Sequence, residues 1–314
     1  MAVWHISSRV ATAALLALVA LDVTLVATAL QSTHTSGIDT SPVSSAFGPL
    51  HPTFAAPTTG PASPSPTTSV IAGNIPLQTI LVALDNQRAW RVGAGSCSAG
   101  GATLATTVDG GKTWARGKAS LRRIVRVRPT DDQVAFIIGA DSTCAAELKD
   151  TGNGGGTWSS GGAVGGAWFR DPKDPMVVSG PGPAVSQPCG RRAVLDLAVL
   201  TAGSAQVLCA DGLVRSTTNN GTVWTNVGTV AGAVALAVST VNPAETYVAR
   251  LGAPDCAGVQ ILRVGQRVAT SCIKASIPKD PGQIAISLIR GGGWLVAGNT
   301  TMRSTDGLLT WNVS

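Results

Sequence analysis

Short apolar runs of four to eight residues dominate the chain from about residue 76 onward. A first set, TILVAL, RRIVRVR, VLDLAVL, VALAV and IAISLI, alternates with a second set, AWRVG, VAFIIG, AQVLCADG and GWLVAG. Val and Ile are abundant in these runs, and Gly, Asp and Asn separate them, which is typical of β-strands joined by tight turns. No amphipathic helical stretch interrupts them. The pattern predicts an all-β domain over residues 76–314.

One turn motif, an Asp box, recurs four times between these strands. Its best preserved copy consists of Thr107, Asp109, Gly111, Thr113 and Trp114. The other copies are Thr151, Asn153, Gly155, Thr157 and Trp158; Thr217, Asn219, Gly221 and Trp224, with Val223 before the Trp; and Ser304, Asp306, Thr310 and Trp311, with Leu308 in place of the glycine. Asp or Asn can accept backbone hydrogen bonds in the turn, glycine supplies positive φ, and the Trp buries an indole. We interpret the box as structural.

The spacing of the boxes indicates a repeated unit of about forty residues. They begin at residues 107, 151, 217 and 304, so the second spacing is half as long again as the first, and the last is nearly twice the first. We expect an eroded unit near residue 260, in VQILRVGQRVATSC, and a loop insertion in DPKDPMVVSGPGPAVSQPCG. Short strands at this period predict a β-propeller of about five to seven four-stranded blades.

The chain resembles the BNR or Asp-box β-propeller family, and within it the photosystem II assembly and stability factor type. The resemblance rests on AWRVG followed by TTVDGGKTW, and on GWLVAG followed by STDGLLTW, and it covers residues 76–314. Sialidases, sortilin-like receptors and many exported bacterial proteins share the box, so the resemblance implies architecture rather than activity. It also implies that the boxes lie on the outer rim, away from the central channel where ligands usually bind.

The N-terminal region predicts a membrane tether. Residues 10–30 form an apolar run long enough to cross a bilayer core of about 30 Å. Arg9 precedes the run and the next Lys or Arg is Arg88, so residues 1–9 are expected in the cytoplasm and the rest outside. The alternative is a signal peptide cleaved near Ala29, giving a secreted protein, but the run exceeds the usual length for such a peptide, which favours a signal-anchor helix. Residues 31–75, rich in Pro, Ser, Thr and Ala, are predicted to form a disordered linker.

Charge and cysteine content refine the location. The net charge is +6, but the domain lacks a dense Lys cluster, so nucleic acid is not an expected partner. Six cysteines in an exported domain predict disulfides, and the pairs we favour among fifteen possibilities are Cys256–Cys272, Cys189–Cys209 and Cys97–Cys144. The excess of Arg over Lys, with abundant Ala, Gly and Val, suggests a high-GC bacterium, such as an actinobacterium.

Catalytic residues are scarce. The three histidines precede residue 76, which excludes a Ser-His-Asp triad or a His-ligated zinc site in the domain. A sialidase would need a Tyr nucleophile with a Glu partner, and the single tyrosine, Tyr247, lies near Glu245 without the arginine triad. No metal or cofactor is predicted.

A cluster of arginines is the remaining candidate for binding. Strand alternation places Arg122, Arg126 and Arg128 on one face, where they could grip an acidic peptide or a phosphate. The other interpretation is a solvated outer strand balanced by Asp131 and Asp132.

These patterns predict a membrane-tethered extracytoplasmic propeller that binds a protein or peptide without catalysis. The alternative is an envelope carbohydrate-binding protein or a sialidase-like glycoside hydrolase. A channel mouth lined by carboxylates and aromatic rings would favour sugar chemistry, whereas a basic or apolar lining would favour a protein partner.

Overall fold

The structure, a computed structural model, describes residues 78–182, 185–239 and 245–314. The predicted signal-anchor helix at 10–30 and the linker at 31–75 lie outside these residues. Within the described ranges, no helix combines the length and the hydropathy that a bilayer crossing requires.

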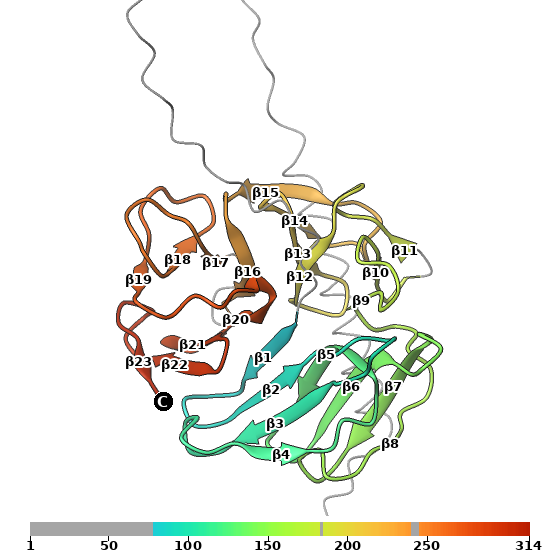
Figure 1. Cartoon of the computed structure of the whole chain (residues 1–314). Helices are drawn as coiled ribbons and strands as arrows, with labels where there is room; N and C mark the ends of the chain where they lie inside the picture. Colours follow the sequence, from blue (N-terminus) through green and yellow to red (C-terminus); the bar gives the residue numbers. More distant parts are fainter. Residues whose placement is uncertain (1–77, 183–184, 240–244) are drawn as a thin grey trace, which may run out of the picture. The chain divides into compact units, whose positions relative to one another are not determined.

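The described residues form six antiparallel sheets, each with its strands in chain order, as in the blades of a propeller (Figure 1). Blade 1 contains β1 (Thr79–Ala83), β2 (Ala89–Gly93), β3 (Thr103–Thr107) and β4 (Ala115–Gly117), and blade 2 contains β5 (Arg123–Pro129), β6 (Ala135–Ala140), β7 (Ala146–Thr151) and β8 (Ser159–Ser160). Blade 3 contains β9 (Phe169–Arg170), β10 (Val178–Ser179) and β11 (Val185–Ser186), and blade 4 contains β12 (Val194–Val199), β13 (Ala205–Cys209), β14 (Leu213–Thr217) and β15 (Thr225–Thr229). Blade 5 contains β16 (Ala233–Val238), β17 (Thr246–Arg250), β18 (Val259–Arg263) and β19 (Ser271–Ile273), and blade 6 contains β20 (Ile284–Ile289), β21 (Gly292–Ala297), β22 (Thr300–Ser304) and β23 (Asn312–Val313).

The blades close into a ring in which the first and last blades meet without exchanging a strand. In chain order, β1 contacts β5, β5 contacts β9, β9 contacts β12, β12 contacts β16, β16 contacts β20, and β20 contacts β1. At the closure, the Gln78 backbone N–H donates to the Gly282 carbonyl at 2.9 Å, beside the short 3-10 helix η1 (Pro281–Gln283). The prediction of an all-β propeller with four-stranded blades is thus confirmed for five of the six blades.

Buried tryptophans tie each of three blades to the next one. The indole N–H of Trp90, on the second strand of blade 1, donates to the Asp131 carbonyl in the first turn of blade 2 at 3.0 Å. Trp294, on the second strand of blade 6, donates in the same way to the Asp85 carbonyl of blade 1 at 2.9 Å. Trp168 donates to the Ala202 carbonyl of blade 4 at 2.8 Å. All three side chains are essentially fully buried, so the core lies mainly between neighbouring blades.

The four Asp boxes share one hydrogen-bond pattern. In the first, the Thr107 hydroxyl donates to Asp109 at 2.8 Å and accepts the Gly111 N–H at 2.9 Å, while Asp109 accepts the Thr113 N–H at 3.0 Å. Asn153, Asn219 and Asp306 occupy the Asp109 position in the other copies with equivalent bonds. Leu308, which replaces the glycine, has a φ of 71° and a buried side chain. Side-chain burial therefore offsets the strain of a non-glycine residue in this conformation.

The stretch between the second and third boxes was misinterpreted from sequence. Residues 171–190 are not a loop inserted into a blade: with Trp168 to Arg170 they build blade 3. The strands are only two residues long, and prolines around them cannot donate to a β-ladder, which explains why the segment resembles a loop. The eroded unit near residue 260 is real, because it supplies β18 and β19 of blade 5.

The cysteines pair as predicted. Cys97–Cys144 joins blades 1 and 2, Cys189–Cys209 joins the segment after β11 to blade 4, and Cys256–Cys272 lies within blade 5. Three disulfides are typical of a domain that folds in an oxidising compartment outside the cytoplasm.

Candidate functional site

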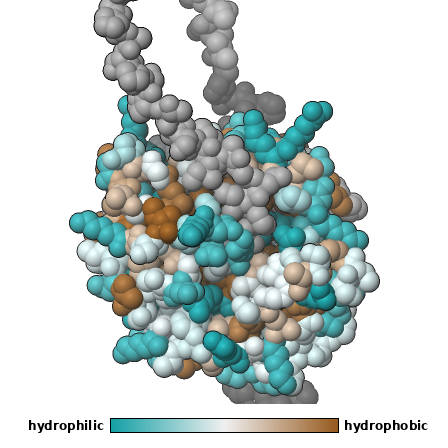
Figure 2. Space-filling model, in the orientation of Figure 1, coloured by the Kyte–Doolittle hydropathy of each residue, from teal (hydrophilic) through white to brown (hydrophobic). Residues whose placement is uncertain are grey.

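The candidate site is the central cavity of the propeller, with a volume of about 440 Å³. Outside this cavity, on the face seen in Figure 2, the hydrophobic residues form separate patches among hydrophilic ones, as is usual for a protein surface. The cavity walls come from the innermost strands β1, β5, β12, β16 and β20, together with Arg170 of β9. Most of the lining is aliphatic, including Ile80, Val82, Leu197, Val199 and Ile286. Among the described residues that line it, the ionisable ones are three arginines and one aspartate, and none is aromatic.

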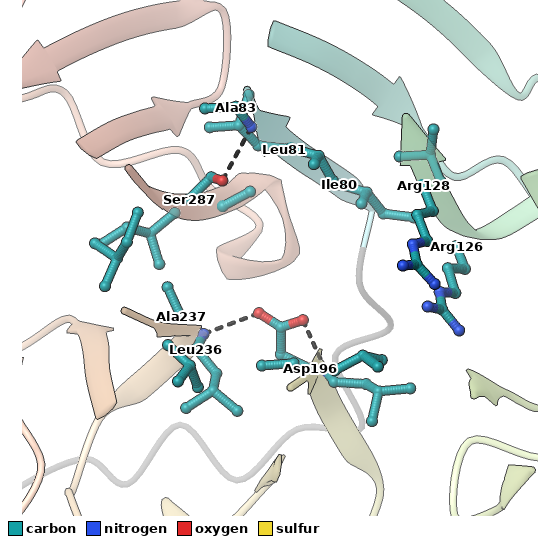
Figure 3. Close-up of a pocket in the computed structure, with 18 of the residues that line it drawn as sticks. Ile80, Leu81, Ala83, Arg126, Arg128, Asp196, Leu236, Ala237 and Ser287 are labelled. Atoms are coloured by element: carbon teal, nitrogen blue, oxygen red, sulfur yellow. Dashed lines mark hydrogen bonds between the residues drawn. The ribbon is translucent and has the colours of Figure 1, made fainter. Parts of the chain in front are cut away.

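The aspartate of the lining, Asp196, holds two blades together. One carboxylate oxygen accepts the N–H of Leu236 in blade 5 at 2.8 Å, and the other accepts the N–H of Leu197 at 2.8 Å (Figure 3). Burial raises the pKa of Asp196, and the Leu236 hydrogen bond and the Arg170 charge oppose that rise. Ser287 plays a comparable part between blades 6 and 1, where its hydroxyl accepts the Ala83 N–H at 3.0 Å.

Two of the three arginines predicted to form a patch lie in the channel. Arg126 and Arg128 extend from β5 into the cavity, and Figure 3 shows their guanidinium groups close together. The Arg126 guanidinium donates to the Trp168 carbonyl, and burial, followed by the charge of Arg128, lowers its pKa to about 10. Within the described part of the chain, Arg128 makes no hydrogen bond or ion pair. Arg126 is therefore cationic at neutral pH, and neither guanidinium has an anionic partner in that part of the chain.

Arg122 does not join this pair. Its guanidinium donates to the carbonyls of Cys97, at 2.8 Å, and Ser98 in the β2–β3 loop. The pairing of β5 with β6 shifts register between Ile124 and Arg126, so a β-bulge breaks the alternation that placed all three arginines on one face. The other interpretation, a solvated outer strand, is wrong because β5 is the innermost strand of its blade.

Arg170 is a channel residue that sequence reasoning did not select. Its guanidinium nitrogen Nη1 donates to the carbonyls of Val194, at 3.2 Å, and Leu195, at 2.9 Å. The side chain is 6% exposed, and burial lowers its pKa to about 10. Its other terminal nitrogen, Nη2, is buried and has no hydrogen-bond partner among the described residues. The sequence contained one indication of a further blade at this position, because Ala167 and Trp168 repeat the Ala89–Trp90 pair that begins AWRVG.

The remaining candidates lie away from the channel. Glu245 forms an ion pair with Arg263 at 3.1 Å, and neither Glu245 nor Tyr247 lines the cavity. The Asp boxes are likewise absent from its lining. Hydrogen bonds from Thr113 hold the pKa of Asp109 at about 2, as those from Thr310 do for Asp306, which fits a structural role. Among the described residues, no cluster of three or more His, Cys, Asp or Glu side chains could hold a metal ion.

Comparisons with known proteins concern the fold. No protein-family model and no curated protein matches the chain. A structure of YCF48 bound to D1 peptide is 17% identical, covers 76% of this chain and 81% of its own, and has a TM-score of 0.30. The Aleuria aurantia lectin, in complex with Fucalpha1-6GlcNAc, is 10% identical, covers 76% of this chain and 94% of its own, and has a TM-score of 0.48.

A third similar structure is the Niastella koreensis GH74 enzyme, 14% identical, with a TM-score of 0.40. The match covers 75% of this chain but 46% of that enzyme, so this chain spans less than half of its length. Likenesses this distant assign neither a ligand nor an activity to this chain. The sheets of the chain itself show a six-bladed β-propeller.

Proposed function

We propose that this protein is a non-catalytic binding module whose central channel takes a segment of a protein or peptide. The observation that carries the proposal is the lining of the channel, which is aliphatic and basic. Aliphatic walls suit apolar side chains, and the arginines suit carboxylates of the same segment. A protein segment can offer both at once.

The lining is poorly suited to sugar chemistry. Glycoside hydrolases generally use two carboxyl groups that flank the scissile bond. Asp196 is the one carboxylate among the described lining residues, and both of its oxygens already accept backbone N–H groups. Glu245, the other candidate acid, is paired with Arg263 outside the channel. Carbohydrate binding or hydrolysis is the alternative function, and the experiment below tests it.

Arg126 and Arg128 are the residues that we propose to recognise the ligand. Burial and, after it, the nearby charge of Arg128 lower the pKa of Arg126, so these two like charges repel each other in the channel. An acidic group between them would relieve this repulsion and complete the hydrogen bonds of both guanidinium groups. We expect the preferred segment to contain Asp or Glu.

We further propose that residues 10–30 anchor the propeller to the cell membrane, with the domain outside the cytoplasm. The three disulfides support the location, and the apolar run supports the anchor. Cell fractionation with protease treatment of intact cells tests both points. Recovery of the protein from the cytosol, or complete protection from protease in intact cells, would contradict this placement.

The binding proposal is tested with the full-length protein in detergent micelles. A random peptide library and a panel of oligosaccharides, including fluorogenic glycosides, are screened in parallel. We expect acidic peptides to be enriched and to bind Arg128→Glu at least about tenfold more weakly, because attraction becomes repulsion. Arg116→Glu, an equal charge change on the outermost strand of blade 1, is the matched control and should bind normally. Glycoside hydrolysis, or selective binding of an oligosaccharide with no peptide enriched, would refute the proposal.

A further inference from the structure

Blade 3 has three strands where the other blades have four, and the position of its tryptophan identifies the missing strand. Trp90 and Trp294 lie on second strands and donate to the first turn of the following blade. Trp168 makes the same bond to the following blade, although it immediately precedes β9, the first strand of blade 3. Therefore β9 occupies the place of a second strand, and none of the described residues supplies the innermost strand of blade 3.

The packing of the next Asp box supports this assignment. The rings of Trp114 and Trp294 meet edge to face at 79°, with centroids 6.4 Å apart, and those of Trp224 and Trp168 meet at 79° and 6.0 Å. A Cβ atom at Gly111 would lie 3.1 Å from the Trp294 ring, and one at Gly221 would lie 3.1 Å from the Trp168 ring. Trp168 thus has the surroundings of Trp294, a second-strand residue.

One backbone edge of β9 lies on the channel side, and no strand among the described residues pairs with it. The Asp171 N–H donates to the Val177 carbonyl at 2.9 Å, on the side of β10. Backbone groups of successive strand residues point to opposite edges, so the N–H and C=O of Arg170 point away from β10, as does the C=O of Trp168. The guanidinium of Arg126, from the channel wall, bonds that Trp168 carbonyl, which confirms that this edge faces the channel.

The chain that leads into blade 3 does not fill the vacancy. Residues 161–167 connect β8 to Trp168 without forming a strand. Val164 and Ala167 pack against the buried cluster of Val125, Ile138 and Phe169, between blades 2 and 3. None of residues 161–167 lines the cavity.

We propose that the ligand of the channel is an extended acidic segment that binds as the missing innermost strand of blade 3, antiparallel to β9. This inference rests on the proposed peptide-binding function and specifies how the peptide binds. The innermost strands β1, β5, β12, β16 and β20 contain five to seven residues each, so a segment of that length fits the place. Main-chain pairing with an unpaired edge is a recurrent mode of peptide recognition.

The side chains around the vacancy match such a ligand. The buried Nη2 of Arg170 has no hydrogen-bond partner within residues 78–182, 185–239 and 245–314, and it can donate to a carbonyl of the added strand. Arg126 and Arg128 border the vacancy from blade 2, and side chains of the added strand on that side would meet them. Acidic residues are therefore expected at alternate positions of the ligand, facing blade 2.

The test uses a six-residue acidic peptide obtained from the library selection on the full-length protein. Each residue of the peptide is N-methylated in turn. We expect losses of at least about tenfold at alternate residues, whose N–H groups face β9, and losses within about twofold at the others. In parallel, hydrogen exchange followed by NMR should show that the peptide slows exchange of the Arg170 amide at least about tenfold, while the Phe169 amide, which faces β10, is unchanged.

The outcomes separate this inference from the proposed function. Arg128-dependent binding without the alternating pattern, or without protection of the Arg170 amide, would overturn the strand-completion mode and leave the channel as a peptide site. If no peptide is enriched, both the proposed peptide-binding function and the strand-completion mode are refuted. Arg170→Lys, which keeps the charge but loses the planar fork, should weaken binding about fivefold or more. The matched control Arg215→Lys should not weaken binding, because that guanidinium lies outside the channel lining and bonds the carbonyls of Pro188, after β11, and Trp224, in blade 4.

Discussion

Replacing Trp168 with Phe tests the assignment of β9 as a second strand. The Trp168 side chain is 1% exposed, its N–H donates to the Ala202 carbonyl at 2.8 Å, and its ring meets Trp224 edge to face. Phe keeps an aromatic ring at the site but removes the N–H and part of the ring system. If Trp168 is equivalent to Trp294, then Trp294→Phe should cost a similar free energy.

Two contributions give the expected loss in the free energy of unfolding for Trp168→Phe. The substitution removes about two methylene equivalents from a buried site, at about 0.8 kcal/mol each. The lost hydrogen bond adds about 1 kcal/mol, and not more, because Ala202 is exposed and water can reach its carbonyl. The free energy of unfolding should fall by about 2.5 kcal/mol, which lowers the Tm of a domain of this size by about 5–10 °C.

Urea denaturation and calorimetry of the full-length protein in micelles measure this loss. Trp158→Phe is a suitable control, because that indole N–H also bonds a carbonyl, of Lys118 at 2.6 Å, but the side chain is partly exposed. The control should lose about 1 kcal/mol less than Trp168→Phe. A loss below about 0.5 kcal/mol for Trp168→Phe, or a Trp294→Phe loss that differs from it by more than about 1.5 kcal/mol, would refute the equivalence.

Three further predictions concern the boxes and the disulfides. Leu308→Gly relieves positive-φ strain of about 1 kcal/mol but removes a buried side chain, so urea denaturation should show a net loss of about 1–3 kcal/mol, and a gain would show that the strain dominates. The lowered pKa of Asp109, about 2 against an ordinary 3.8, makes its contribution to stability complete above about pH 4 and lost as the pH falls toward 2. The Tm of Asp109→Asn should therefore fall less than that of wild type between pH 5 and pH 2. Parallel curves of Tm against pH for the two proteins would contradict this. The Cys97→Ser/Cys144→Ser variant, which opens a loop with a sequence separation of 47, should lose about 4 kcal/mol in the chain-entropy treatment, and an unchanged Tm would show that the bond does not form.

Strand content and most blade boundaries could be predicted because they depend on local pattern. Runs such as TILVAL and IAISLI became the innermost strands β1 and β20, and AWRVG and GWLVAG became second strands. Blade 3 escaped prediction because its strands are too short for a period of two to appear, and because its prolines imitate a loop. The repeated Ala-Trp at 167 and 168 was the one local trace of its true architecture.

The candidate site was predictable only in part. Arg126 and Arg128 were selected from their alternation, but nothing local showed that β5 would be the innermost strand of its blade or that a bulge would turn Arg122 away. Arg170 could not be selected, because its burial and its carbonyl partners come from blade 4. That the Arg170 Nη2 atom is buried with no partner among the described residues likewise results from tertiary packing.

By itself, the sequence determined the fold class and the repeated turn chemistry, because both depend on residues that are close in the chain. It favoured one pairing of the cysteines among fifteen, and the structure decided for that pairing. Only the tertiary structure decided that the ring has six blades, that it closes without strand exchange, and that the described residues give blade 3 three strands instead of four. The physical reason is that a channel is formed by strands far apart in the chain, and a missing strand becomes visible only when its neighbours on both sides are in place.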